Sequence, residues 1–391
     1  MGDLDYDPYD VATAFDPHPL FARLREEAPL HYSERHDVYV LSRFDDLAQV
    51  YVDRERFISG RGTILPWLRP DHEVPTVIPR GAFVWEDEPL HTMHRGLLSR
   101  LFTPKQLRSL EPKIRSLCAE ILDPLVGEGG FDITNELGNE LPMRVIGLLM
   151  GIPDVDQPAL RDHYLDFSLQ HTTESLTGGV LGQYVDWRVE HPSDDIMSKL
   201  LAAEFEDETG TIRRLTRAEL MSCLNVVEGG GTITTKVLLG WIAKLLADHP
   251  DQRKLLIDDP SLIPNAIDEI LRFEPTHLHT CRYVARDCEM HGRTIPEGSI
   301  VLLLTPAANR DPRRISDPDT FDVRRPPGPL MTFALGAHHC LGANLARLEV
   351  RIALQALLER FPDWSVDTDR ARFFYTDTRY RGWDPLPLIA A

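Results

Sequence analysis

Apolar residues recur at helical spacing over most of the chain. From Thr103-Pro104, a favoured helix start, to Ile121 they return every three or four positions, which predicts one amphipathic helix. Similar patterns predict helices over residues 16–28 with Asp16 as cap, 44–50, 133–149 with a break near Pro142, 157–170, 216–247 and 264–273, and a long helix from Leu341 onward. Helices therefore make up most of the predicted structure.

Strand patterns are few and short. Tyr32 and residues 38–41 predict one hairpin, and residues 291–294 and 299–304 predict a second one. The tail over 364–388 predicts further short strands. The sequence thus predicts a mainly α fold with a small β region, although its 391 residues could by length alone form up to three domains.

Residues 57–88 are rich in glycine and proline and predict a long irregular loop. Loops of that length inside a compact protein are usually functional. Its apolar side chains, Trp67 and Phe83 among them, either line a pocket or anchor the loop on the core.

Charge and cysteine content exclude several classes of protein. A formal net charge of -19 argues against binding to nucleic acid or anionic membranes. The five cysteines show no C-x-x-C spacing, which favours a reducing compartment. No signal peptide and no long apolar span is evident, so we expect a cytoplasmic protein without a membrane anchor.

The stretch 333–342 is suited to presenting one thiolate, that of Cys340, to a large flat group. Gly336 and Gly342 permit tight turns, and the helix that follows places the sulfur near a helix N-terminus, where an anion is stabilised. His338 is positioned to meet a negative group. The alternative is an inert buried cysteine.

The predicted helix 216–247 begins with a capping box, Thr216 with Glu219. Glycines 229–231 interrupt its interior at a cost of about 1 kcal/mol each relative to alanine. Close approach of a flat ligand, with a kink, would account for them.

The pattern Phe333-x-x-Gly-x-His338-x-Cys340-x-Gly342 resembles the haem-binding loop of the cytochrome P450 family. The resemblance implies one domain over 1–391, with the triangular P450 fold around a buried haem b whose iron Cys340 ligates. Further motifs follow in the family's order. They are His91, Arg95 and Arg282 for the haem propionates, Gly230, Gly231 and Thr234 for the dioxygen groove, and Glu269, Arg272 and Arg325 for a structural network.

The same resemblance implies a monooxygenase that oxidises a small lipophilic molecule with dioxygen. Electrons would come from NAD(P)H through a ferredoxin reductase and a ferredoxin, and we expect a monomer. Candidate pocket residues are Trp67, Phe83, Val227 and Ile233. Arg95, Arg100, Lys105, Arg108, Lys113 and Arg351 either form a docking patch for an acidic ferredoxin or a solvated helix surface. Residues 171–190 look shorter than the family's lid helices.

One position departs from the family. Ile233 stands before Thr234, where members usually carry an acid that feeds protons. Protons would then come through Thr234 and water, or indirectly from Glu228, which lies off the face of Thr234. The departure leaves open a peroxygenase, a nitric oxide reductase or a rearrangement enzyme. A haem sensor or carrier without catalysis is a further alternative.

Overall fold

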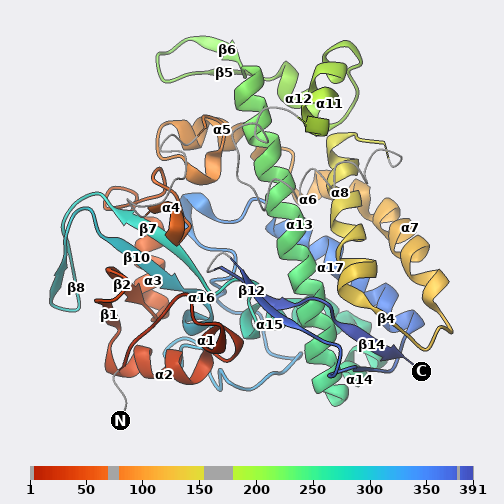
Figure 1. Ribbon diagram of the computed structural model, residues 1–391. Coiled ribbons are helices and arrows are strands. Elements are labelled where there is room, and N and C mark those ends of the chain that lie inside the picture. Colours follow the sequence, from red (N-terminus) through yellow and green to blue (C-terminus); the bar gives the residue numbers. More distant parts are fainter. Residues whose placement is uncertain (1–3, 69–78, 154–178, 377–378, 391) are drawn as a thin grey trace.

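The computed structural model describes residues 4–68, 79–153, 179–376 and 379–390 (Figure 1). Short helices form the N-terminal part: α1 (Val11–Phe15), α2 (His18–Glu27), α3 (Phe44–Val52), α4 (Leu65–Leu68), α5 (Leu90–Ser99) and α6 (Pro104–Leu107). The remaining helices are α7 (Glu111–Leu122), α8 (Glu140–Met150), α11 (Gly179–Glu190), α12 (Ile196–Ala202), α13 (Arg217–Asp248), α14 (Pro250–Asp258), α15 (Ile263–Phe273), α16 (Thr305–Ala308) and α17 (Ala343–Arg360). The fold is mainly α, as the periodicity predicts.

The largest sheet of the described residues has five strands in the order β1-β2-β10-β7-β3. Its strands are β1 (Leu30–Ser33), β2 (Val38–Leu41), β10 (Ile300–Leu304), β7 (His279–Val284) and β3 (Phe57–Ile58). A second sheet joins β11 (Trp364–Val366), β14 (Pro387–Ala390) and β4 (Gly130–Asp132). Separate pairs are β5 (Glu204–Glu206) with β6 (Ile212–Arg214), β8 (Cys288–Met290) with β9 (Arg293–Ile295), and β12 (Phe373–Thr376) with β13 (Tyr380–Trp383).

Helix α13 crosses the whole molecule in Figure 1, from the β5–β6 hairpin at the top to α14 at the bottom. Its N-terminus carries the predicted capping box between Thr216 and Glu219. Most of its side chains are buried, and it packs against α8, α17 and β13. The helix is continuous through its three glycines.

A buried histidine joins the start of α13 to α5 and to the loop before it. His94 Nδ1 lies 2.7 Å from Glu86 Oε2, and His94 Nε2 lies 3.8 Å from Glu219 Oε1. Glu219 also accepts two hydrogen bonds of 2.8 Å from Arg213 on the β5–β6 hairpin. This His94 chain therefore connects two parts of the sequence that are far apart, residues 86–94 and residues 213–219.

Three helix predictions were wrong in detail, each at a proline or beside a tight turn. Residues 16–28 do not form one helix capped by Asp16, because Asp16 ends α1 and α2 begins after Pro17. Thr103 does cap α6, but a tight turn separates α6 from α7, and Pro112 has no N–H to continue the first helix. Pro142 does not interrupt residues 133–149; it lies in the first turn of α8, after a π-helical turn over 134–138.

The predicted hairpin over 291–304 was also wrong. Strand β9 pairs with β8, whereas β10 lies between β2 and β7 in the large sheet. The turn through Gly298 (φ 89°) thus connects two different sheets. The hairpin of residues 30–41 is confirmed, with His31 opposite Val40. The predicted helix 157–170 and residues 171–178 of the expected lid lie outside the described residues.

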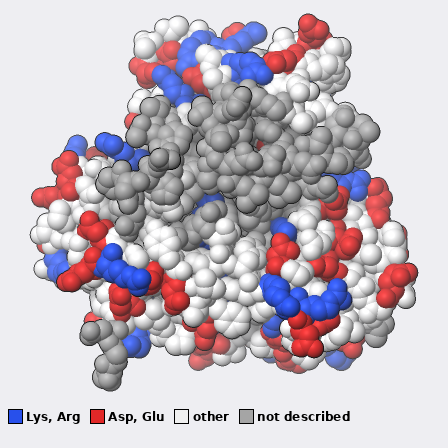
Figure 2. Space-filling view, in the orientation of Figure 1, with Lys and Arg blue, Asp and Glu red and all other residues white. Residues whose placement is uncertain are grey.

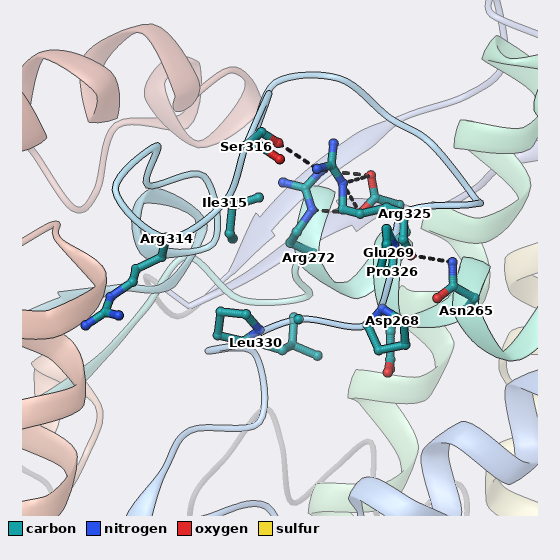
Figure 3. A pocket seen from close by; sticks show the side chains of 13 residues that line it. Asn265, Asp268, Glu269, Arg272, Arg314, Ile315, Ser316, Arg325, Pro326 and Leu330 are labelled. Atoms are coloured by element: carbon teal, nitrogen blue, oxygen red, sulfur yellow. Dashed lines mark hydrogen bonds and ion pairs between the residues drawn. The ribbon is translucent and has the colours of Figure 1, made fainter.

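Glu269 joins two arginines at the edge of a cavity of about 220 Å³ beside α15 (Figure 3). Its carboxylate accepts hydrogen bonds of 2.7 and 2.8 Å from Arg272 and 3.1 Å from Arg325. Both arginines also donate to backbone carbonyls of the segment 309–320, such as that of Ser316. The network therefore fixes this irregular segment to α15.

Membrane-spanning helices are not found: within the described ranges, no helix has the length and apolar content that crossing a bilayer requires.

We predict that Glu269→Ala destabilises the protein by about 3 kcal/mol or more, because it leaves Arg272 and Arg325 without their counter-charge. Chemical denaturation measures the change. Glu27→Ala, which removes an exposed i,i+4 pair with Arg23, is the matched control and should leave the unfolding midpoint unchanged. Equal effects of the two substitutions would contradict this reading.

Candidate active site

A cavity of about 330 Å³ separates α13 from the Cys340 loop. Its α13 wall is formed by Val226, Val227, Gly230, Gly231, Thr234, Thr235 and Leu238. The facing wall contains Phe333, His338, Cys340, Gly342, Leu345 and Glu349. One side of the cavity is closed by Thr276, His277, Arg282, Arg379 and Tyr380. Its remaining sides include Phe83, Val84, Arg95 and Ile146.

Cys340 differs from the other four cysteines, which are all buried. Its sulfur has accessible surface because it faces the cavity, although protein surrounds it elsewhere. Burial raises the pKa of its thiol, and the amides of Gly342 and Ala343 together with the charge of Arg95 act against that rise. The sulfur thus lies at the start of α17, where the first amides point toward it.

Local backbone geometry holds this loop in place. The amide of Cys340 donates a 2.8 Å hydrogen bond to the carbonyl of Phe333. Gly336 has φ 70°, and a Cβ there would lie 2.6 Å from the carbonyl oxygen of Tyr51 in α3. Only glycine therefore allows the loop to lie this close to α3.

Four basic side chains gather beside the sulfur; we call His91, Arg95, Arg282 and His338 the cationic cluster. The rings of His91 and His338 lie 4.2 Å apart. Burial, and then the charges of Arg282, His91 and Arg95, lowers the pKa of His338 to about 2. Burial also lowers the pKa of His91, so the positive charge of the cluster at neutral pH is that of Arg95 and Arg282. Three sequence-distant segments, α5, β7 and the Cys340 loop, bring these residues together.

The cationic cluster is short of negative charge. Among the described residues, Arg95 and Arg282 form no ion pair with a carboxylate, and Nε2 of His91 is buried without a hydrogen-bond partner. Buried cations are normally neutralised by an anion. The site is therefore suited to a ligand that carries carboxylates and a metal for the sulfur, and haem has both.

The glycines of α13 have different surroundings. A Cβ at Gly230 would meet nothing within 4 Å, because that position faces the cavity. A Cβ at Gly231 would lie 2.5 Å from Cδ1 of Ile146, so this glycine lets α8 pack closely. Thr234 lines the cavity, and its hydroxyl donates a 2.8 Å hydrogen bond to the carbonyl of Gly230.

Neither Ile233, at the position where the family usually has an acid, nor Glu228 lines the cavity. Ile233 is not among the lining residues and packs against the hydrophobic core. Glu228 is 3% exposed, is also absent from the lining, and its Oε1 has no hydrogen-bond partner. Burial alone raises the pKa of Glu228 to about 8, so this carboxyl is protonated at neutral pH.

Of the other candidate pocket residues, two line the cavity and one does not. Phe83 and Val227 line the cavity, whereas Trp67 lies against Trp85, with ring centroids 4.4 Å apart, and does not line it. Sequence reasoning missed Glu349, His277 and Arg379. Glu349 could have been found, because a carboxylate on the apolar face of the helix that begins after Cys340 is unusual.

Comparisons with known proteins agree with this site. The family model for cytochrome P450 matches residues 157–374. The chain is 35% identical over 398 residues to putative cytochrome P450 123 of Mycobacterium tuberculosis, covering 99% of this chain and 97% of that protein. The chain belongs to the cytochrome P450 family.

Other similar proteins support the assignment. Vitamin D(3) 25-hydroxylase of Pseudonocardia autotrophica is 34% identical over 383 residues, which cover 95% of this chain and 93% of that protein. The structure of cytochrome P450 CYP109Q5 from Chondromyces apiculatus matches with a TM-score of 0.89 and 31% identity, covering 99% of this chain and 98% of that one. P450s are haem b monooxygenases with a cysteine ligand, and so this chain is an oxidoreductase of that type.

We predict that Glu228→Gln makes the P450 more stable than the wild type as pH rises from about 4.5 to about 8. The folded state holds a proton on Glu228 that the unfolded state releases in this window, so wild-type stability falls there. Denaturant unfolding at several pH values measures the difference, which should reach a few kcal/mol. The exposed Glu128→Gln is the matched control. A difference that does not change with pH would contradict the buried neutral carboxyl.

Proposed function

We propose that Cys340 is the cysteine through which this P450 holds haem, and that residues 1–391 form one domain around it. The observation that supports this proposal most is that one cavity-facing sulfur lies beside a cationic cluster that lacks an anion. Cys340 would ligate the iron, and His91, Arg95, Arg282 and His338 would hold the propionates. Phe333 and Gly342 would pack beside the sulfur.

When bound, haem supplies the activation of dioxygen for transfer of one oxygen atom to the substrate. The residues of this chain provide space, orientation and protons. Gly230 leaves open space in the cavity beside α13, and Thr234 and Thr235 place hydroxyl groups on the same wall. Because Ile233 cannot carry a proton, proton transfer relies on Thr234 and water, with Glu228 as a protonated group farther off.

The substrate of this enzyme is proposed to be a small lipophilic molecule. Phe83, Val84, Val226, Val227 and Leu238 make much of the cavity wall apolar. Residues 57–88, of which 57–68 and 79–88 are described, would cover it. A relative is named for the 25-hydroxylation of vitamin D(3), which is consistent with such a pocket.

Electrons are proposed to come from a separate ferredoxin. Four basic side chains are exposed near the junctions of α5, α6 and α7, and within the described part of the chain none of them forms an ion pair. We call them the α5–α7 basic patch: Arg100, Lys105, Arg108 and Lys113. The segment lies beside the Cys340 loop, because Arg95 of α5 donates to the carbonyl of His339 and α6 contacts α17. Arg351 instead pairs with Glu111 at 2.9 Å.

The patch stands out against an acidic protein of net charge -19. On the face seen in Figure 2, uncharged residues cover much of the described surface, and Lys and Arg form separate groups among Asp and Glu, one of them at the top, around β5, β6 and α12. An acidic ferredoxin would be attracted to the α5–α7 basic patch and repelled by much of the remainder.

Ile233 favours one second candidate, an enzyme driven by peroxide. A peroxide already carries the two electrons and both oxygen atoms, so it needs less proton delivery than dioxygen does. Turnover with peroxide alone, compared with ferredoxin and NAD(P)H, separates the two. Faster turnover with peroxide would favour this candidate.

We predict that the reduced protein under carbon monoxide shows the strongly red-shifted Soret band of thiolate-ligated haem, and that Cys340→His loses it because imidazole replaces the thiolate. Absorption spectra measure both. Cys288→Ala, a buried cysteine in β8 away from the cavity lining, should keep the band. An unchanged band in Cys340→His would overturn the assignment of Cys340.

We predict that the double charge reversal Lys105→Glu with Arg108→Glu raises the KM for reduced ferredoxin roughly tenfold and weakens its dependence on salt. Steady-state kinetics measure both. The double reversal Arg286→Glu with Arg370→Glu, at exposed sites after β7 and after β11, is the charge-matched control. Peroxide-driven turnover should not change in either variant. A KM that rises equally in both would show that only total charge matters.

A further inference from the structure

Arg379 and Arg381 stand two residues apart and have opposite surroundings. Arg381 is 1% exposed, and its guanidinium group has partners on all three nitrogens: it pairs with Glu274 and donates to the carbonyls of Ala14 and Phe15. Arg379 lines the cavity, and its Nε is buried without a hydrogen-bond acceptor. Among the described residues, no carboxylate forms an ion pair with Arg379.

The guanidinium of Arg379 is held in place by its own segment. The carbonyl of Arg379 accepts a 2.8 Å hydrogen bond from the amide of Leu278, and a bridge joins Tyr380 to His277. The guanidinium carbon lies 4.1 Å from the centre of the Tyr380 ring, a cation–π contact. Arg379 is therefore anchored to the cavity wall beside His277 and is not a freely moving surface side chain.

The charge of Arg379 acts mainly on a histidine outside the cationic cluster. The charges that lower the pKa of His338 are those of Arg282, His91, Arg95 and Arg54. Arg379 acts instead on His277, whose pKa burial and then the charge of Arg379 lower to about 4. Once the propionates neutralise the cationic cluster, Arg379 still lacks an anion.

A lone guanidinium in a largely apolar cavity is costly unless a ligand neutralises it. A carboxylate fits best, because its two oxygens match the Nε–H and Nη–H edge of a guanidinium side by side. The only carboxyl group among the described lining residues is that of Glu349. Burial raises the pKa of Glu349 to about 8, so it is protonated at neutral pH and does not supply the missing charge.

We propose that Arg379 binds a carboxylate of the substrate, so that this P450 oxidises lipophilic acids whose apolar part lies along Phe83 and Val227. The inference rests on the proposed function of the same cavity and names its substrate class. Arg379 would act by fixing which end of the acid points away from the reacting carbon. Neutral molecules of the same shape would bind less tightly, because they leave the guanidinium unpaired.

The test is isothermal calorimetry of the haem-containing protein with decanoic and dodecanoic acid and with the methyl ester of each. The wild type should bind the acids about tenfold or more tightly than their esters. Arg379→Gln should abolish this preference by weakening the acids alone. Arg379→Lys should retain part of it, because it keeps the charge and loses the two-point contact. Arg370→Gln, at an exposed arginine of the same C-terminal region, is the control and should behave as wild type.

Equal binding of acids and esters by the wild type, no binding of any acid, or an acid preference that survives in Arg379→Gln would each overturn the proposal. Circular dichroism and haem content of each variant exclude misfolding as the cause. The proposed function fails by a different observation, the absence of the red-shifted Soret band under carbon monoxide. Calorimetric preference does not depend on that band, so the two failures are distinguishable.

Discussion

Buried positive charge without a matching negative charge is the constraint on which this structure depends. The cationic cluster brings α5, β7 and the Cys340 loop to one place, although their residues span 91 to 338 of the chain. No carboxylate among the described residues neutralises Arg95 or Arg282. A ligand that supplies the anion would therefore stabilise this part of the fold, because it binds only the folded state.

Helix α13 serves the site and the core with neighbouring residues. Its glycines differ in purpose: Gly231 permits close packing with Ile146 of α8, while Gly230 leaves the cavity open. Thr234 and Thr235 face the cavity, and Ile233 faces the core. The cost of glycine in a helix interior is offset by packing along the rest of its buried length.

Structural features that depend on residues near in sequence were predictable, whereas those that depend on contacts between distant residues were not. The capping box at Thr216 and the hairpin of residues 30–41 depend on near neighbours, and both are confirmed. The hairpin over 291–304 was wrong because β10 takes its partners from β2 and β7, far away in sequence. Cys340 was identified from a local motif, whereas Arg379 was missed, because the absence of a partner exists only in the folded chain.

The His94 chain has a mechanical consequence for the cavity. His94 belongs to α5 and contacts Glu86 in the segment that precedes this helix. It lies one helical turn from His91 of the cationic cluster. Through Glu219 and Arg213 the same contacts extend to the start of α13 and to the β5–β6 hairpin. Phe83 and Val84 of the segment before α5 line the cavity, so displacing them would also disturb α5, which carries His91 and Arg95. The apolar wall of the cavity and the cationic cluster are therefore mechanically coupled.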